Sequence, residues 1–369
     1  MIYFIVPAAG AFSICEVVSE VRPALADRFR IIHYEDLFAQ KQFHRGSYVL
    51  AALDQLSPTM RQLVCSLHEQ LTAVAGVRIL NHPQRSLQRF DLLSKLYELR
   101  RNDFRAVRAS DDFTKLRYPV FVRGERSHDG ALTPLLDSPR QVEAAIGKAV
   151  IQGRPFSDLL VVEFCPTADD EGLYRKYGAF IVDKRIIARH INQGMHWMTK
   201  WADAKFTGEL MLAERDYVFN NPHESELAEI FRIANIDYGR IDYAMKNGRV
   251  QTWEINLNPT INRGPGPRSH TSAGLPPEIQ AIRNETKGYF FDRFQEAWQA
   301  IDTPVSLEPV VTLNLDQAAI KAATAESVVN GRFLASLRAI VRPIKPVVEP
   351  LANPFLRGIT SLMKSRHSR

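Results

Sequence analysis

Cysteine is scarce in this sequence, with three residues in 369. Cys15, Cys65 and Cys165 lie far apart and form no Cys-x-x-Cys pair. A disulfide framework needs an even set of cysteines, and a structural zinc site needs closely spaced ones. We therefore expect neither, and the composition fits a protein of the reducing cytoplasm.

The sequence also lacks a long apolar run and a stripe of basic residues. The apolar start at 1–6 has no basic residue before it and is interrupted by Pro7 and Gly10, so it is typical of neither a signal peptide nor a membrane span. The net charge of +6 and the isoelectric point near 9.2 are mildly basic, which suits an anionic ligand such as a nucleotide. Because basic residues are not interleaved with aromatic ones, we expect no binding to nucleic acid.

The length and composition are those of a globular protein with two or three domains. Hydrophobic residues make up 45% of the chain and charged residues 24%. An apolar strand at 1–6, a helix around 14–25 and a strand at 29–34 predict a small parallel α/β layer. Apolar spacing then predicts a helix over 47–75, a strand at 77–80 and a helix at 86–101.

The middle of the chain alternates between predicted strands and helices. The strands at 174–182 and 185–190 are expected to pair, because only the turn at 183–184 separates them. The predicted elements are strands at 120–122 and 159–165, a helix at 138–150, strands at 174–182 and 185–190 around a turn at 183–184, and helices at 225–234 and 277–301.

The strongest local signal is a hairpin at Asn247-Gly248. Both residues tolerate positive φ, and β-prone runs at 238–245 and 250–257 flank them. Two antiparallel strands therefore follow from local chemistry.

Polar side chains share a face on each of these two strands. Because side chains alternate along a strand, Glu254, Asn256 and Asn258 lie on one face, and Arg240 and Asp242 share a face of the partner strand. Oxygen ligands gathered on a buried sheet are costly unless something satisfies them, and Mg²⁺ prefers such ligands. The alternative is a solvent-facing strand with polar residues pointing outward.

This region resembles the metal-binding end of the ATP-grasp superfamily. Asp242, a hairpin, and then Glu254-Ile255-Asn256-Leu257-Asn258-Pro259 match a motif that reads Asp, then Glu-x-Asn-x-x-Pro. In that family these side chains hold Mg²⁺ against the phosphates of ATP. The resemblance therefore implies metal binding by Asp242, Glu254 and Asn256.

The resemblance also implies a set of nucleotide-binding residues. Arg123 stands at a strand end where the family usually has a Lys, and it can grip phosphate oxygens bidentately. The loop at 124–130 would cover the phosphates, with His128 either closing over them or lying on the surface. Lys176 would address the phosphates, with Arg175 in reserve because it points the other way.

An adenine-binding hinge is implied where the strand at 159–165 ends. Glu163 as an ordinary strand-end carboxylate remains the alternative. The hinge residues are Val162, Glu163, Phe164 and Cys165.

Two arginines are candidate catalytic residues. Arg240 shares its strand face with Asp242, and Arg263 follows the motif in a segment made irregular by glycine and proline. Arg263 could bind an acceptor carboxylate or a developing phosphate charge. Arg189 and His190, at the end of the strand at 185–190, could also address the acceptor.

The implied fold is α/β and α+β. An N-terminal α/β domain at 1–101 precedes a two-subdomain ATP-grasp fold, with a nucleotide subdomain at 102–165 and a metal and substrate subdomain at 166–301, and Mg-ATP is expected between them. Residues 302–369 form a basic tail of helices interrupted by proline. This tail could contact an anionic membrane or a partner, but a frayed cationic end fits better.

The activity implied by the resemblance is that of a Mg-ATP-dependent ligase. Such enzymes activate a small-molecule carboxylate as an acylphosphate, which an amine or another nucleophile then attacks. A kinase of the same fold and a non-catalytic nucleotide-binding or scaffold protein are the alternatives. The sequence leaves a homodimer open.

Overall fold

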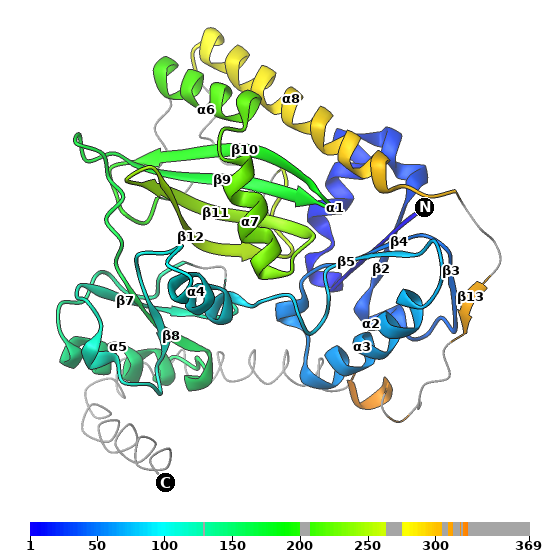
Figure 1. Ribbon diagram of the computed structural model, residues 1–369, viewed down its shortest axis with the longest axis horizontal. Coiled ribbons are helices and arrows are strands. Elements are labelled where there is room, and N and C mark those ends of the chain that lie inside the picture. The colour runs from blue at the N-terminus through cyan, green and yellow to red at the C-terminus, as the bar shows by residue number, and fades with distance from the viewer. Residues whose placement is uncertain are drawn as a thin grey trace. The chain divides into compact units, whose positions relative to one another are not determined.

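The structure is a computed structural model that describes residues 1–127, 130–199, 207–262, 275–304, 309–312, 318 and 320–323. The chain divides into two compact units. The first is built from residues 1–87 and 167–324, and the second contains residues 88–166. Figure 1 shows the elements of both.

The first unit contains a parallel sheet of four strands in the order β2-β1-β4-β5. β1 (Ile2–Val6) is central and buried throughout, as its apolar sequence predicts, and pairs with β2 (Phe29–His33) and β4 (Ser47–Leu50). β5 (Arg78–Leu80) continues the sheet beyond β4. A two-stranded antiparallel ribbon accompanies it, formed by β3 (Gln42–His44) and β13 (Pro309–Thr312).

Two expectations for this layer are wrong. Ser47–Leu50 is a strand and not the start of a helix, because these four buried residues complete the parallel hydrogen bonding of β1 and β5. Helix α3 (Pro58–Thr72) begins only where the Ser57 side chain accepts a hydrogen bond from the Met60 amide.

The helix expected around 14–25 is also broken into pieces. Proline at position 23 ends it, since proline cannot continue a helix in its interior. The observed pieces are 3-10 turns at Ala8–Gly10 and Pro23–Arg28, α1 (Phe12–Glu16) and a π-helical turn at Val17–Val21, and the remaining short elements of the layer are α2 (Tyr34–Leu37) and a 3-10 turn at Leu53–Gln55.

The first unit also contains an antiparallel sheet in the order β10-β9-β11-β12. Its strands are β9 (Tyr174–Val182), β10 (Arg185–Gly194), β11 (Tyr238–Lys246) and β12 (Arg249–Asn256). The hairpin turn between β11 and β12 has positive φ at Asn247 (50°) and Gly248 (73°), which confirms the Asn-Gly prediction.

Three helices accompany this sheet, with α6 and α8 alongside β10 in Figure 1. Aromatic residues of α8 pack into one core with both sheets: Phe294 and Trp298 contact Phe4 of β1, Phe180 of β9 and Tyr238 of β11. α6 was not expected from the sequence, although Thr207 caps it by accepting from the Leu210 amide. The helices are α6 (Gly208–Asn220), α7 (Glu224–Ala234) and α8 (Pro277–Ile301).

Asn81 joins the parallel and antiparallel sheets. Its side chain donates to the carbonyls of Leu50 and Tyr238 and accepts from the amides of Asp237 and Tyr238. Both N–H donors and both lone pairs of this buried amide are thereby used. The two sheets are fixed to each other at the point where β5 ends and β11 begins.

In the part of the second unit that the structure describes, a three-stranded antiparallel sheet, β6-β8-β7, is accompanied by two helices. Its core contains Val120 and Val122 of β7, Leu159 and Val161 of β8, and Ile146 of α5. Its elements are α4 (Arg89–Glu98), β6 (Ala106–Arg108), β7 (Val120–Gly124), α5 (Pro139–Ile151) and β8 (Leu159–Glu163), with 3-10 turns at Phe113–Lys115 and Phe156–Asp158.

The predicted fold class, an N-terminal α/β layer followed by α+β layers, is confirmed by these sheets. The predicted domain boundaries stay a prediction. Most of the predicted tail at 302–369 lies outside the described residues. Within the described part of the chain, no helix combines the length and the apolar character that crossing a bilayer requires.

Candidate functional site

The β11–β12 hairpin places the predicted metal ligands opposite each other. Asp242 pairs with Glu254 and Arg240 pairs with Asn256, and a bulge follows where Tyr243 pairs with Thr252. Directly opposed residues of an antiparallel pair share a face. The expectation that these four side chains lie on one face therefore agrees with the register.

The same face continues across β9 and β10. Gly178 pairs with Asp242 on one side and with His190 on the other, so His190, Gly178, Asp242 and Glu254 form a row across four strands. Gly178 has a structural reason to lack a side chain, because a Cβ there would lie 2.5 Å from Cε1 and 2.7 Å from Nε2 of His190. The imidazole therefore lies over Gly178 on the Asp242 side of the sheet.

Two cations hold the Asp242 carboxylate. Arg240 donates from Nε to Oδ1 (2.7 Å) and from Nη2 to Oδ2 (3.3 Å), and Lys176 Nζ donates to Oδ2 (3.2 Å). Asp242 is 3% exposed, so its charge is compensated inside the protein. Burial alone would raise the pKa of Asp242, but Arg240 and Lys176 outweigh burial and hold this pKa well below its usual range.

Lys176 and Arg175 differ as the strand alternation predicts. Lys176 faces Asp242, whereas Arg175 Nη1 bonds Asp169 Oδ2 at 2.6 Å. Asp169 also accepts from the Leu173 and Glu171 amides, so the acidic turn at 169–171 is a local structure.

His190 is uncharged in this setting. Burial lowers the pKa of His190 well below its usual value, and the positive charge of Arg240 lowers it further while Asp242 opposes them. This face of the sheet thus combines two carboxylates, a neutral imidazole and the cations Arg240 and Lys176. The Arg240 side chain is the more deeply buried of the two cations.

The donor set fits Mg²⁺ by its chemistry. Asp242 and Glu254 have carboxylate oxygens, and Asn256 has an amide oxygen, which accepts a hydrogen bond from the Asn258 backbone amide (2.8 Å). Among the described residues, no three His, Cys, Asp or Glu side chains converge as a metal site, and the predicted set takes its third ligand from an amide, that of Asn256.

The segment after β12 is fixed to the first helix of the chain. Ser13 Oγ donates to the Pro259 carbonyl (3.0 Å) and accepts from the Ile261 amide (2.9 Å). Asn258 Nδ2 donates to the Gly10 carbonyl at 3.2 Å, and a Cβ on Gly10 would meet that amide at 2.4 Å. The N-terminal turn thereby positions the end of the predicted metal-binding motif.

A second buried charge cluster lies beside this segment. Arg189 donates from Nε and Nη2 to the Ile261 carbonyl (3.4 Å each), and its guanidinium lies 4.5 Å from the centre of the Phe290 ring. Burial lowers the pKa of Arg189 to about 10, which leaves it charged at neutral pH. Burial raises the pKa of Glu214, which accepts from the Ile191 amide at 3.0 Å.

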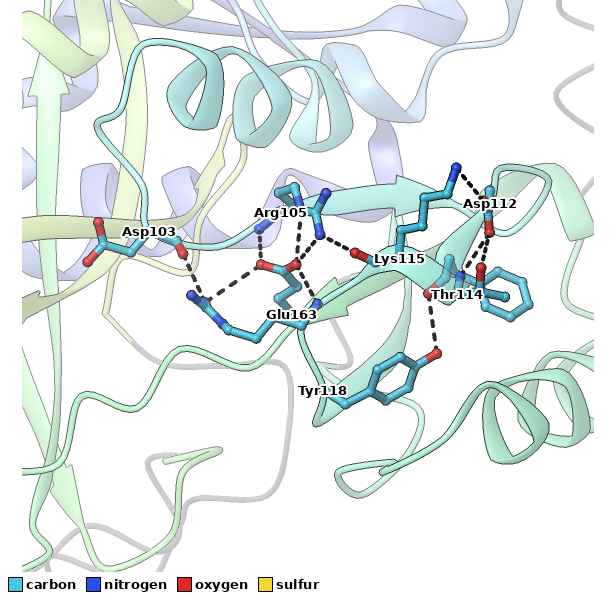
Figure 2. A network of polar contacts seen from close by, with 9 residues as sticks. Asp103, Arg105, Asp112, Thr114, Lys115, Tyr118 and Glu163 are labelled. Carbon is cyan, nitrogen blue, oxygen red and sulfur yellow. Dashed lines mark hydrogen bonds and ion pairs between the residues drawn. The ribbon is translucent and has the colours of Figure 1, made fainter.

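In the second unit, Glu163 is enclosed by hydrogen-bond donors, as Figure 2 shows. Its oxygens accept from the amides of Arg105 (3.1 Å) and Arg117 (2.8 Å) and from Nε of Arg105 (2.9 Å). Arg117 Nη2 lies 3.6 Å from Oε2 and also donates to the Asp103 carbonyl at 2.9 Å. This carboxylate ties the strand end to two upstream segments.

The predicted hinge backbone is also engaged in the sheet. Val162 pairs with Ala106 and Phe121, and the Glu163 and Phe164 amides donate to the carbonyls of Arg105 and Pro119. An adenine at this strand end would therefore need partners other than those two amides. The role of Val162, Glu163, Phe164 and Cys165 stays a prediction.

Arg123 lies buried at the end of β7, where the following loop is held from two sides. Arg89 of α4 donates from Nη1 to the carbonyls of Gly124 (2.8 Å), Glu125 (2.5 Å) and Ser127 (2.9 Å). Asp158 accepts from the Glu125 and Arg126 amides. Neither anchor had a signal in the sequence, since both lie far away along the chain.

Two predicted site residues, His128 and Arg263, lie outside the described residues. The structure brings Arg240, Asp242, Glu254, Asn256 and Lys176 to one face of the antiparallel sheet. Arg123 and the hinge residues lie in the second unit.

Comparisons with known proteins returned structural matches only. No protein-family model and no curated protein matches the sequence. The structure is similar to D-alanine–D-alanine ligase from Bacillus anthracis, with 13% identity, 82% of this chain and 98% of that chain covered, and a TM-score of 0.46. It is also similar to the same ligase from Helicobacter pylori (14% identity, 82% and 100% covered, TM-score 0.43) and to L-amino acid ligase from Bacillus licheniformis (13%, 70% and 66%, 0.38).

The described elements follow the order that was expected from the sequence: a parallel sheet, a three-stranded sheet with two helices, and an antiparallel sheet whose last hairpin carries Asp242, Glu254 and Asn256.

Proposed function

We propose that this protein is an ATP-grasp ligase that uses Mg-ATP to activate a small-molecule carboxylate as an acylphosphate, which an amine or another nucleophile then attacks. One observation carries the proposal. Asp242 and Glu254 oppose each other on the same sheet face as Arg240, and Lys176 reaches that face from β9. Carboxylates suit the metal and cations suit the phosphates, which is the pairing that phosphoryl transfer needs.

The residues have separate roles. Asp242, Glu254 and Asn256 would hold Mg²⁺, which neutralises charge on the phosphates when bound. Lys176 would bind a phosphate oxygen. Arg240, held by Asp242 and by the Thr260 carbonyl (3.1 Å), would stabilise negative charge on the transferred group.

The reaction proceeds in two displacements. A carboxylate oxygen attacks the γ-phosphorus of ATP, the bond to the β–γ bridging oxygen breaks, and ADP leaves with that electron pair. The nucleophile then attacks the acyl carbon and inorganic phosphate leaves. Arg189 and His190 are proposed to orient the acceptor, because they are neighbours in the middle of β10, where its register with β9 shifts, and Arg263 follows the motif as a second cation.

The remaining assignments belong to the same proposal. Arg123, His128 and the hinge residues would bind the nucleotide. The protein would act in the cytoplasm on small-molecule substrates and without nucleic acid, with a homodimer left open.

Hydroxylamine trapping tests the activity. Folded protein is incubated with Mg-ATP, a panel of carboxylates and hydroxylamine, and ADP and hydroxamate are measured together. A ligase gives both products, and Glu254→Gln gives neither. ADP with a phosphorylated hydroxyl compound and no hydroxamate would instead identify a kinase.

Nucleotide binding is tested separately by thermal unfolding. A ligand of the native state raises the unfolding midpoint as its concentration exceeds Kd. We expect a Mg-dependent rise with ATP that Glu254→Gln weakens. No rise at millimolar Mg-ATP in folded protein would refute the proposal in favour of a scaffold.

A further inference from the structure

The two cations on Asp242 differ in how firmly they are held. Arg240 makes two bonds to the carboxylate and a third to the Thr260 carbonyl, and its side chain is 16% exposed. Lys176 makes one bond, at 3.2 Å, and its side chain is 30% exposed. Among the described residues Asp242 is its one hydrogen-bond or ion-pair partner.

A metal ion and Lys176 compete for the same oxygen. Lys176 Nζ bonds Oδ2 of Asp242, and Arg240 occupies Oδ1 and shares Oδ2. A divalent ion that approaches Asp242 therefore meets two positive charges within hydrogen-bond distance of its ligand, and like charges at such distances repel strongly in a buried site. A lysine ammonium on a flexible stem can leave, whereas the planar, three-point Arg240 is fixed.

We infer that Lys176 is the exchangeable counter-ion of Asp242. When the nucleotide binds, the Lys176 ammonium leaves the carboxylate for a phosphate of the nucleotide, so the metal binds only together with that phosphate. This inference rests on the proposed function and adds to it the requirement that metal and nucleotide bind together. Free metal is excluded from the site, and metal and nucleotide strengthen each other's binding. Such coupling is reciprocal, so Lys176 must weaken metal binding in the absence of nucleotide.

The neighbouring residue supplies a matched control. Arg175 lies next to Lys176 on β9 but bonds Asp169 on the other side of the strand, so Arg175→Met removes a charge from the same strand without touching Asp242. Lys176→Met removes the counter-ion and keeps an unbranched side chain. Lys176→Arg keeps the charge, and thermal unfolding confirms that each variant is folded.

The probe is Mn²⁺, and two titrations are compared. In the first, Mn²⁺ alone is added and free Mn²⁺ is counted by electron paramagnetic resonance. In the second, preformed Mn²⁺ complex of a non-hydrolysable ATP analogue is titrated by calorimetry. Lys176→Met should bind Mn²⁺ alone about tenfold or more tightly than wild type, because a nearby unit charge is gone. Arg175→Met and Lys176→Arg should match wild type within about twofold.

Each outcome decides something. Adding Glu254→Gln to Lys176→Met should remove the gain, which places the ion at this site. If Lys176→Met and wild type bind Mn²⁺ alone with the same affinity, the inference is overturned and the proposed function is left standing. Failure of the nucleotide complex to bind wild type and Arg175→Met overturns the proposed function itself.

Discussion

Two buried carboxylates, one in each unit, are each held by two cationic residues, but through different atoms. The Glu163 carboxylate accepts hydrogen bonds from the backbone amides of Arg105 and Arg117 as well as from a side-chain donor of Arg105. The bonds that the described structure shows at the Asp242 carboxylate come from the side chains of Arg240 and Lys176.

The difference separates a structural brace from a site that can exchange partners. A backbone amide cannot move away without unfolding its segment, so the partners of Glu163 are as fixed as the strands around it. A lysine side chain moves by rotating about single bonds, so Asp242 can change its partner while the sheet stays intact. Burial and charge are alike at the two places, and the type of donor distinguishes them.

The largest effect that tests this comparison is on the stability of the second unit. Glu163→Gln should lower the free energy of unfolding by roughly 3–5 kcal/mol, because it removes the charge from a buried cluster and turns an amide NH₂ toward donors. Urea unfolding measures the change.

Glu98→Gln is the matched control. It neutralises an exposed carboxylate of the same unit, 3.6 Å from Lys95, and should change stability by no more than about 0.5 kcal/mol. Equal losses in the two variants would contradict the role of Glu163 as a brace.

Asp242→Asn should act on ligand binding. In saturating Mg-ATP at about a hundred times Kd, wild type gains about 2.7 kcal/mol of stability, and this gain should vanish in the variant because both the metal and its coupling to the phosphates are lost. Glu98→Gln, which changes an exposed carboxylate outside the proposed site, should keep the wild-type Mg-dependent rise. Thermal unfolding with and without Mg²⁺ makes the comparison. A Mg-dependent rise that survives in Asp242→Asn would place the metal elsewhere.

Local chemistry was sufficient to predict the hairpin and its polar face. Asn247-Gly248 specifies the turn, and strand alternation separates Lys176 from Arg175. These signals act over a few residues, so the turn and the face of each side chain can be predicted without knowing which strands pair. The buried β1 and the strand β8 follow from apolar runs in the same way.

The failure at Ser47–Leu50 and the missed contacts of Glu163 and His190 have a common cause, which is distance along the chain. Ser47–Leu50 is too short for its period to separate strand from helix, and it becomes a strand because β1 and β5 flank it. Glu163 meets Arg105, 58 residues away, and a sequence contains no signal for such a pairing. His190 joins the Asp242 row through Gly178, whose missing side chain could have suggested a close approach.

Gly178→Ala tests whether the imidazole is fitted into the row. The added methyl would lie 2.5 Å from His190 Cε1, so we expect a loss of about 1–3 kcal/mol in the free energy of unfolding. Combining it with His190→Ala should recover part of the loss, because the clashing ring is removed.

Gly288→Ala in α8 is the control. A Cβ there meets nothing within 4 Å, and an alanine in a helix interior is favoured over glycine by about 0.5–1 kcal/mol. If the combined variant recovers nothing, or Gly178→Ala behaves like Gly288→Ala, His190 does not occupy the space over Gly178.

The smallest expected effect is on acid sensitivity, and it separates Asp242 from the histidines. Burial lowers the pKa of His68 to about 4, and the neighbouring His82 ring lies 4.3 Å away between centroids. In the unfolded chain His68 takes up a proton near the ordinary histidine pKa of 6.5, but the folded protein does not until pH 4, so stability must fall as the pH drops from 6.5 to 4. Asp242, whose folded pKa lies below its usual range, stays ionised throughout this window.

His68→Asn should therefore flatten the dependence of the unfolding midpoint on pH between 6.5 and 4, while Asp242→Asn keeps the wild-type slope between pH 6.5 and about 5, because an unfolded aspartate, with an ordinary pKa of 3.8, takes up its proton below that range. The flattening is partial, because the pKa values of His82, His190 and His223 are also lowered by burial. Thermal midpoints at a series of pH values for the three proteins measure both slopes. A slope in His68→Asn equal to that of wild type would show that His68 is as accessible to protons in the folded protein as in the unfolded chain. A steeper slope in Asp242→Asn would show instead that the folded protein takes up the Asp242 proton within the window before the unfolded chain does, and that Arg240 and Lys176 hold the carboxylate less firmly than their geometry indicates.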